Sequence, residues 1–258
     1  MSESGVVVEQ HGSTGVLTLD RAERRNPLSA AVMAEFTAEL RRLSASPEVA
    51  VIVVRARGPA FSAGHDLTEL VGAELADQRE VFRLCTAMME AVQQVPQPVV
   101  CAVQGAALAA GCQLVASCDL AVAAEGAVFG TPGVRIGLFC STPMVPVSRA
   151  VGRKRALQML LTGEVVSAER AADWGLVNEV VPAEQLQDRV DELAGAIAAA
   201  SPLTVRIGKR AFYRQVDLPQ DQAYEEMREV MATNAVTADA QEGMRAFLDK
   251  REPVWKGE

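Results

Sequence analysis

The sequence has no CxxC pair and only two histidines, His11 and His65. Its five cysteines are scattered along the chain, at positions 85, 101, 112, 118 and 140. Structural zinc sites need closely spaced Cys and His ligands, and disulfide frameworks are typical of small secreted chains. We therefore expect reduced, mostly buried thiols in a cytosolic protein and no metal site.

A recognisable targeting segment is also missing. The first ten residues, MSESGVVVEQ, have no basic stretch followed by an apolar run and no arginine-rich amphipathic pattern, so we expect a cytoplasmic location. One uncharged stretch, 99–118, has the length of a membrane span. It contains Gln104 and Gln113, many alanines and glycines, and a turn at Gln104-Gly105. These features predict a buried strand, a turn and a buried helix, and no membrane contact.

Positive charge is scarce, because 25 Lys and Arg face 33 Asp and Glu and give a formal net charge of −8. This balance argues against a general nucleic-acid binder. A phosphate-bearing ligand would need a local basic patch, and Arg24 and Arg25 lie together in the polar loop 20–27. The alternative for either arginine is a solvated charged loop. G-x-G-x-x-G, P-loop and G-x-S-x-G motifs do not occur.

Buried β-type runs and helical patterns alternate in the first half of the chain. We expect strands at 6–8, 16–19, 50–55, 99–103, 120–123 and 127–129, and helices from the N-cap Ser29, at 78–95 and at 111–117. Such alternation predicts an α/β domain with a largely parallel sheet. The later pattern is mainly helical, with helices from 183, 202, 219 and 237, the last running to the end. We place a core domain at residues 1–200 and a helical region at 201–258, which has little core of its own and is expected to pack on another subunit.

Two loops share one design: small residues follow a buried strand and precede a helix. The first is Phe61 to Asp66, with Asp66 as the cap of a short helix, and the second is Gly105 to Gly111. A helix N-terminus offers unpaired N–H groups, and small residues let a ligand oxygen approach them. Together the loops could form an oxyanion hole that stabilises charge on a carbonyl oxygen. Taken singly, each loop is also explained by tight strand–helix packing.

Several ordered motifs resemble those of the enoyl-CoA hydratase/isomerase, or crotonase, family. AFSAGHDL at 60–67 is similar to its "AFxAGxDL" loop, and PVVCAVQG at 98–105 to its "KPxIAAVxG" strand. AGCQL at 110–114 stands where the family has "GGGCEL", and CDLAVA at 118–123 matches "CDIxxA". WGLVN at 174–178 and the tail 242–256 complete the series. The resemblance covers nearly the whole chain and implies the α/β crotonase (ClpP/crotonase-like) fold of repeated ββα-type units, with a C-terminal helical region that forms trimers or hexamers.

The resemblance also implies a ligand and its site. The ligand would be an acyl-CoA thioester, with coenzyme A as part of the substrate and no separate cofactor. The backbone N–H groups of Ala63 and Ala110 would be the oxyanion donors. Phe247 and Lys250 match tail positions that can reach the CoA of a neighbouring subunit. The residues implied at the acyl-CoA site are Arg24, Arg25, Ala63, Gly64, His65, Asp66, Leu67, Ala110, Phe247 and Lys250.

Two positions depart from the family pattern. Family hydratases use one glutamate in "GCE" and a second after the proline of "FxxPE", whereas this chain has Gln113 and Gly133. An amide can hold water but cannot relay a proton, and general acid–base catalysis contributes on the order of 10²–10⁴-fold per group. Cys140 is a candidate substitute, while Ser141 and Thr142 are expected to cap the following helix.

The segment 131–143, TPGVRIGLFCSTP, resembles a divergent subgroup of the family. Three functions follow as hypotheses. The nominal one is hydration of a 2-enoyl-CoA. Decarboxylation fits the missing bases better, because loss of CO₂ generates the enolate without proton abstraction. The third is acyl-CoA binding without catalysis. Hydration assays with short- to long-chain enoyl thioesters separate the first from the other two.

Overall fold

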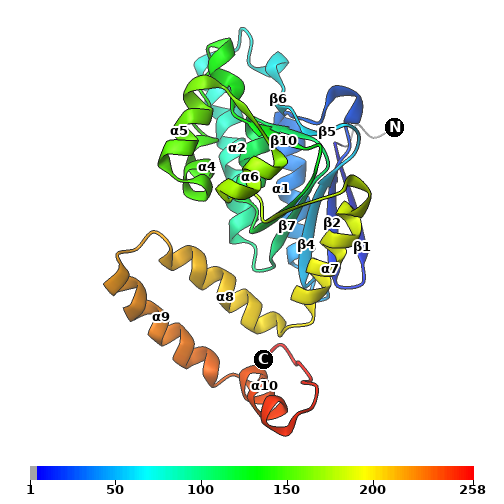
Figure 1. The fold of residues 1–258 in the computed structure, drawn as a ribbon, viewed down its shortest axis with the longest axis vertical. Helices are drawn as coiled ribbons and strands as arrows, with labels where there is room; N and C mark the ends of the chain where they lie inside the picture. The colour runs from blue at the N-terminus through cyan, green and yellow to red at the C-terminus, as the bar shows by residue number, and fades with distance from the viewer. Residues whose placement is uncertain (1–4) are drawn as a thin grey trace.

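The computed structural model describes residues 5–258. Its larger sheet has six strands in the order β1-β2-β4-β7-β9-β12. β1 and β2 form an antiparallel hairpin, and every other neighbouring pair is parallel. The strands are β1 (Val6–His11), β2 (Thr14–Leu19), β4 (Val51–Ala56), β7 (Val99–Val103), β9 (Leu120–Ala124) and β12 (Glu179–Val181). The predicted α/β architecture with a largely parallel sheet is confirmed (Figure 1).

A second sheet has four strands in the order β11-β10-β8-β5. Its strands are β5 (Ala60–Ser62), β8 (Ala106–Leu108), β10 (Val128–Gly130) and β11 (Val165–Ser167). A two-stranded ladder joins β3 (Pro27–Leu28) to β6 (Gly64–His65). The sequence predicted a turn at 105–110 and a loop at 58–65, which is wrong for the short strands there. These strands are too short and too rich in small residues to show a β-type pattern, and pairing with one another defines them.

Ten α-helices surround these sheets within residues 5–258. They are α1 (Ala30–Ser44), α2 (Leu75–Gln94), α3 (Ala110–Ser117), α4 (Met144–Val151), α5 (Arg153–Thr162), α6 (Ala168–Trp174), α7 (Leu186–Ala198), α8 (Pro202–Gln215), α9 (Gln220–Ala235) and α10 (Ala238–Asp249). The predicted cap of α1 is present, since Ser29 accepts the N–H of Val32. The cap expected from Ser141 or Thr142 is absent, because α4 begins after Pro143 without a side-chain cap. At the start of α6, Ser167 accepts the N–H of Arg170. No helix among residues 5–258 is both long and apolar enough to cross a membrane.

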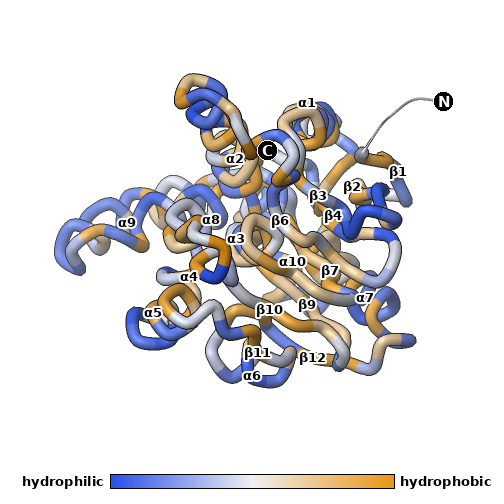
Figure 2. The backbone as a smooth tube through the Cα atoms, turned by 90° about the horizontal axis from the view of Figure 1, so that it is seen from above, coloured by the Kyte–Doolittle hydropathy of each residue, from blue (hydrophilic) through white to orange (hydrophobic). Residues whose placement is uncertain are grey.

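Both faces of the larger sheet are buried. Along β4, Ile52 and Val54 face the main core with α1 and α2, while Val51 and Val53 face a smaller core under α7. This arrangement explains why β4 is apolar at consecutive positions, as strands of parallel sheets covered on both sides are. Figure 2 shows hydrophobic colours along β7 and β9 and more hydrophilic ones along α9.

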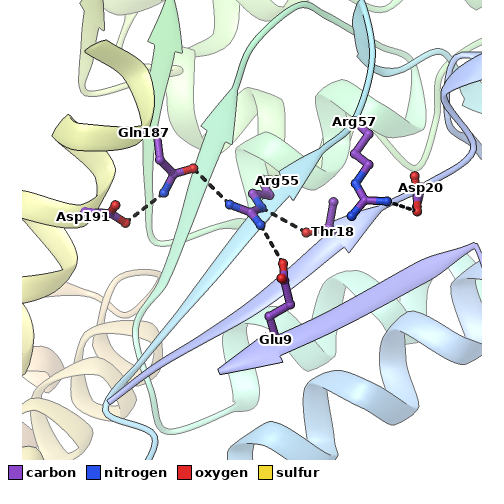
Figure 3. A network of polar contacts seen from close by, with 7 residues as sticks. All are labelled: Glu9, Thr18, Asp20, Arg55, Arg57, Gln187 and Asp191. Atoms are coloured by element: carbon purple, nitrogen blue, oxygen red, sulfur yellow. Dashed lines mark hydrogen bonds and ion pairs between the residues drawn. The ribbon is translucent and has the colours of Figure 1, made fainter. Parts of the chain in front are cut away.

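One arginine ties three strands of the larger sheet to α7. The Arg55 guanidinium at the end of β4 donates to Glu9 at 2.7 Å, to the Thr18 hydroxyl at 3.0 Å and to Gln187 at 3.2 Å (Figure 3). Gln187 in turn donates to Asp191 on α7. Three strands and a helix are thus joined through one side chain.

Helices α8, α9 and α10 extend away from the sheets, at the bottom of Figure 1. Lys209 on α8 connects them to the core: its ammonium lies 2.7 Å from Asp119 and donates to the carbonyls of Val92 and Gln97, both at 2.9 Å. Tyr213 donates to the other Asp119 oxygen at 2.7 Å. Asp119 therefore has a structural role and joins α8 to the start of β7, since it also accepts the N–H of Val99.

The prediction that the last helix runs to the end of the chain is wrong. α10 ends at Asp249, and Lys250 adopts a left-handed conformation with φ of 54°. The buried Asp239 carboxylate accepts the N–H groups of Lys256 and Gly257 and so folds the tail back against the start of α10. The tail therefore pairs its backbone with a side chain instead of continuing the helix.

Candidate active site

The candidate site lies where β5, β8 and β10 end. β8 pairs in parallel with both other strands, so the segments that follow them emerge at one edge of the smaller sheet. The approach is close: a Cβ on Gly111 would lie 2.8 Å from the Ser62 Cβ and 2.5 Å from the Ser62 carbonyl oxygen. Only glycine fits at position 111 without moving one of the two segments.

A cavity of about 780 Å³, here called the strand-end cavity, opens at this edge. The predicted site residues that line it are Arg24, Ala63, His65, Asp66, Leu67, Ala110, Gly133 and Cys140. Arg25, Gly64, Gln113, Phe247 and Lys250 do not line it in this chain. Its volume lies in the range of sites for small ligands and cofactors. The fold thus brings eight residues from distant parts of the sequence to one cavity.

The two predicted oxyanion donors differ in their hydrogen bonding. The Ala110 N–H is the first of α3 and donates to no acceptor within the described residues, so it is available at a helix N-terminus. The Ala63 N–H donates to the Arg25 carbonyl at 2.9 Å. A ligand oxygen at Ala63 would compete with that carbonyl, whereas one at Ala110 would not.

Ala109, directly before the free N–H, has a strained backbone. Its φ is 48° and its ψ is −115°, a region that side chains with a Cβ rarely adopt. Its own N–H donates to the Gly130 carbonyl at 2.9 Å, which fixes the turn between β8 and α3. The strain holds the Ala110 N–H at the cavity wall.

Ala109→Gly is expected to stabilise the protein by about 1 kcal/mol, because strain of roughly 1–3 kcal/mol is removed and glycine loses about 0.5–1 kcal/mol in chain entropy. Urea denaturation measures the change. Ala38→Gly, at an exposed position inside α1, is the matched control and should destabilise by about 1 kcal/mol. Equal destabilisation by both variants would contradict the strain at Ala109.

Gln113, at the position that the resemblance aligns with the first glutamate, does not line the strand-end cavity. Its side chain is 3% exposed, and its Oε1 accepts a hydrogen bond from the Cys85 thiol of α2 at 3.6 Å. Burial raises the pKa of Cys85 to about 12, so the thiol keeps its proton and remains a donor. The pair Gln113–Cys85 is therefore a neutral packing contact, and neither group can exchange a proton near pH 7.

Gly133 occupies the second glutamate position, and the chain leaves no room there for a side chain. A Cβ on Gly133 would overlap the Leu138 carbonyl oxygen and would lie 2.8 Å from the Cys140 sulfur. The Leu138 N–H donates to the Gly133 carbonyl at 3.0 Å, which holds the segment 138–140 over this position. The segment 138–140 thus fills the space that a side chain at position 133 would need.

The Cys140 thiol lines the strand-end cavity at the place that a residue-133 side chain would occupy. It is 7% exposed, and burial raises its pKa above the ordinary thiol value, although the Gly133 backbone N–H opposes this in part. A protonated thiol is a poor nucleophile and a poor base. Cys140 can offer a proton or an apolar surface here, and not a thiolate.

His65 and Asp66 also line the cavity. Burial lowers the pKa of His65, and the Leu28 backbone opposes this only in part, so the ring is neutral at pH 7. It packs edge-on against Phe82, with ring centroids 5.4 Å apart, and neither ring nitrogen makes a hydrogen bond. Asp66 accepts from the Thr68 hydroxyl and backbone, as its predicted capping role requires, and pairs with Arg24 at 3.2 Å. The Thr68 hydrogen bonds and Arg24 lower the pKa of Asp66, which stays ionised.

Several lining residues were not predicted from the sequence. Phe82 belongs to the face of α2 that meets the cavity, and the periodicity of that helix could have indicated it. Arg135 and the apolar residues Ile136, Leu138 and Phe139 follow Gly133 in the segment that departs from the family pattern. The sequence shows that this segment departs from the family pattern, but no spacing rule indicates which of its side chains face a ligand.

These features define the class of protein. The family model described as enoyl-CoA hydratase/isomerase matches residues 9–258, so the chain belongs to that family, and its fold is the crotonase fold. A solved enoyl-CoA hydratase of Mycobacterium smegmatis superposes with a TM-score of 0.96 at 42% identity, covering 98% of this chain and 99% of that one.

Among its relatives are members of the divergent subgroup that the motifs resembled. Enoyl-CoA hydratase domain-containing protein 3, mitochondrial, of Danio rerio is 44% identical over 98% of this chain and 88% of the relative. The solved human protein of that name superposes with a TM-score of 0.95 at 42% identity, covering 97% and 100% of the two chains. The 2,3-dehydroadipyl-CoA hydratase of Escherichia coli is 32% identical over 98% and 99%.

The prediction of a cytoplasmic location is wrong by this comparison. Five relatives at 43–47% identity, from fish, frog, rodents and human, carry the word mitochondrial in their names. The prediction was inferred from the N-terminal residues alone, and the fold and the strand-end cavity contain no information about the compartment.

Proposed function

We propose that this protein binds an acyl-CoA thioester in the strand-end cavity and polarises the thioester carbonyl. The observation that supports this most directly is the unpaired Ala110 N–H at the start of α3, which faces a cavity large enough for an acyl group. Arg24 on the same cavity is placed to meet CoA phosphates, and coenzyme A enters only as part of the ligand. No further cofactor is required for this step.

The chemistry follows from the donors. A thioester oxygen that accepts the Ala110 N–H, and shares the Ala63 N–H with the Arg25 carbonyl, is stabilised as it gains negative charge. The α-carbon then becomes acidic, and an enolate can form there. Hydration of an enoyl-CoA, the family's nominal reaction, also needs groups that deliver and remove protons, and Gln113 and Gly133 supply none. We therefore expect little or no hydratase turnover.

Decarboxylation is the second candidate, supported by the same two positions. Loss of CO₂ from a malonyl-type thioester breaks the carbon–carbon bond and leaves its electron pair as the enolate, so no base is needed. A proton from solvent or from the neutral Cys140 thiol would complete the reaction. Non-catalytic acyl-CoA binding is the third candidate. Turnover of malonyl-type thioesters separates it from decarboxylation.

The C-terminal helices are proposed to form a trimer, or a hexamer of two trimers. Residues 201–258 have exposed apolar side chains with no cover in one chain, including Phe212, Tyr224, Met231 and Phe247, the last 84% exposed. A neighbouring subunit would cover such a surface. Phe247 and Lys250 do not reach their own cavity, so a role at the CoA site would require a neighbour.

The test is an optical titration with a conjugated 2,4-dienoyl-CoA. Polarisation of the carbonyl is expected to shift the absorbance of the bound dienoyl group to longer wavelength, because the excited state gains charge at the oxygen that the N–H groups stabilise. Saturated acyl-CoA should compete for the site and reverse the shift. Saturable binding without a shift would leave non-catalytic binding as the function, and no binding would refute the proposal.

A further inference from the structure

The strand-end cavity contains one cation that no acidic group neutralises. Its charged lining residues within the described chain are Arg24, Asp66 and Arg135. Arg24 and Asp66 form an ion pair at 3.2 Å, which leaves Arg135 without a carboxylate partner. In a chain with net charge −8, an unpaired guanidinium beside a mainly apolar cavity is a specific feature.

The exposed Arg135 side chain makes one hydrogen bond, to the backbone. Arg135 Nε donates to the Thr162 carbonyl at 3.4 Å, and the side chain packs on Gly163, where a Cβ would lie 2.9 Å from Nε and 3.0 Å from Cγ. Gly163 ends α5 in a left-handed conformation with φ of 64°. The two terminal nitrogens remain for a ligand, and an oriented guanidinium fork matches a carboxylate.

Its position points to the acyl end of the ligand. Arg135 follows Gly133 by two residues, and Gly133 and Cys140 mark the wall beside the reacting carbons in the function proposed above. Arg24, which lines the same cavity, is the residue proposed above to meet the CoA phosphates. The same cavity is also lined by Phe82, Leu138 and Phe139, whose apolar side chains suit methylene groups.

We infer that Arg135 binds a carboxylate at the far end of the acyl group, so that the ligand is the CoA thioester of a dicarboxylic acid. This inference rests on the proposed acyl-CoA binding and narrows it to one substrate class. A guanidinium could bind a CoA phosphate in the same way. The two possibilities can be separated, because every acyl-CoA has the phosphates and only some have a second carboxylate.

The experiment is calorimetric titration of the full chain with saturated thioesters of equal chain length: adipyl-CoA against hexanoyl-CoA, and succinyl-CoA against butyryl-CoA, with free CoA. We expect the wild type to bind the dicarboxylic member of one pair about 10- to 100-fold more tightly, as a charge-assisted hydrogen-bonded pair provides. Arg135→Gln should abolish that preference and leave hexanoyl-CoA affinity unchanged. Arg135→Lys should keep part of it.

Arg153→Gln is the matched control, since it removes the same charge from an exposed position outside the cavity, and it should keep the preference. Equal binding of both members of each pair by the wild type would overturn the inference and leave acyl-CoA binding intact. A uniform loss for all ligands, free CoA included, in Arg135→Gln would assign the guanidinium to CoA phosphates and also overturn it. Failure of every thioester to bind would refute the proposed function itself.

Discussion

Replacing Lys209 with methionine is expected to destabilise the protein by about 3–5 kcal/mol, because it leaves a buried carboxylate without its partner. Only 6% of the Lys209 side chain and 15% of Asp119 are exposed, and their charged atoms are 2.7 Å apart. Burial lowers the pKa of Lys209, while Asp119 opposes the shift, so the pairing offsets part of the cost of burying the ammonium. The carbonyls of Val92 and Gln97 would lose their donor as well.

Chemical denaturation monitored by far-UV circular dichroism gives the change. Arg149→Met is the matched control, since its pair with Asp217 is exposed on both sides at 3.5 Å and contributes only about 0–1 kcal/mol. Hydrogen exchange adds a spatial test: Lys209→Met should lose protection first in α8, α9 and α10. A change below about 1 kcal/mol would show that the Lys209–Asp119 pair does not hold α8 on the core.

Gly133→Glu would introduce a carboxylate at the position of the second family glutamate, and we expect it to lower stability without producing hydratase activity. It should destabilise the protein by about 3 kcal/mol or more, because the new Cβ meets the Leu138 carbonyl and the Cys140 sulfur and a carboxylate enters a mainly apolar wall. It should also produce no enoyl-CoA hydration, because the segment 138–140 occupies the volume in which the carboxylate would act.

Gly195→Ala is the matched control for this change. Gly195 is exposed inside α7 and its added Cβ would meet nothing within 4 Å, so alanine should stabilise the protein by about 0.5–1 kcal/mol. The double change Gln113→Glu with Gly133→Glu should remain inactive too, since position 113 faces Cys85. Measurable loss of the enoyl absorbance by a folded Gly133→Glu variant would show that the 138–140 wall yields easily, contrary to the geometry.

Much of the fold could be predicted from the sequence, because long helices and strands have a recognisable spacing of hydrophobic residues. Helix α1 was predicted from Ser29 and from the spacing of Val32, Met33, Phe36, Leu40 and Leu43, and all five side chains are buried as expected. The strands of the larger sheet follow from runs of valine. Short strands such as β8 have no such pattern, because their conformation depends on neighbours that are distant in sequence.

The site was predicted less completely. Sequence identified the positions of Ala63, Ala110, Gly133 and Cys140, which do meet at one cavity. It could not show that the Gln113 amide turns to α2, or that the Ala63 N–H already has an acceptor, because both depend on the direction of a bond after folding. Arg135 was not singled out, because no motif or spacing marks it in the sequence.

The two walls of the strand-end cavity differ in how far they can be redesigned. One wall includes Ala63 and Ala110, and the backbone next to these donors is tightly packed: a methyl group at Gly64 or Gly111 would collide with its neighbours, so substitution there alters the donor geometry or the fold. The other wall consists of side chains that end in solvent, with Ile136, Leu138 and Phe139 each more than a third exposed. Changes of ligand preference are therefore open to selection or engineering on the 136–139 side, while the carbonyl-binding side stays constant.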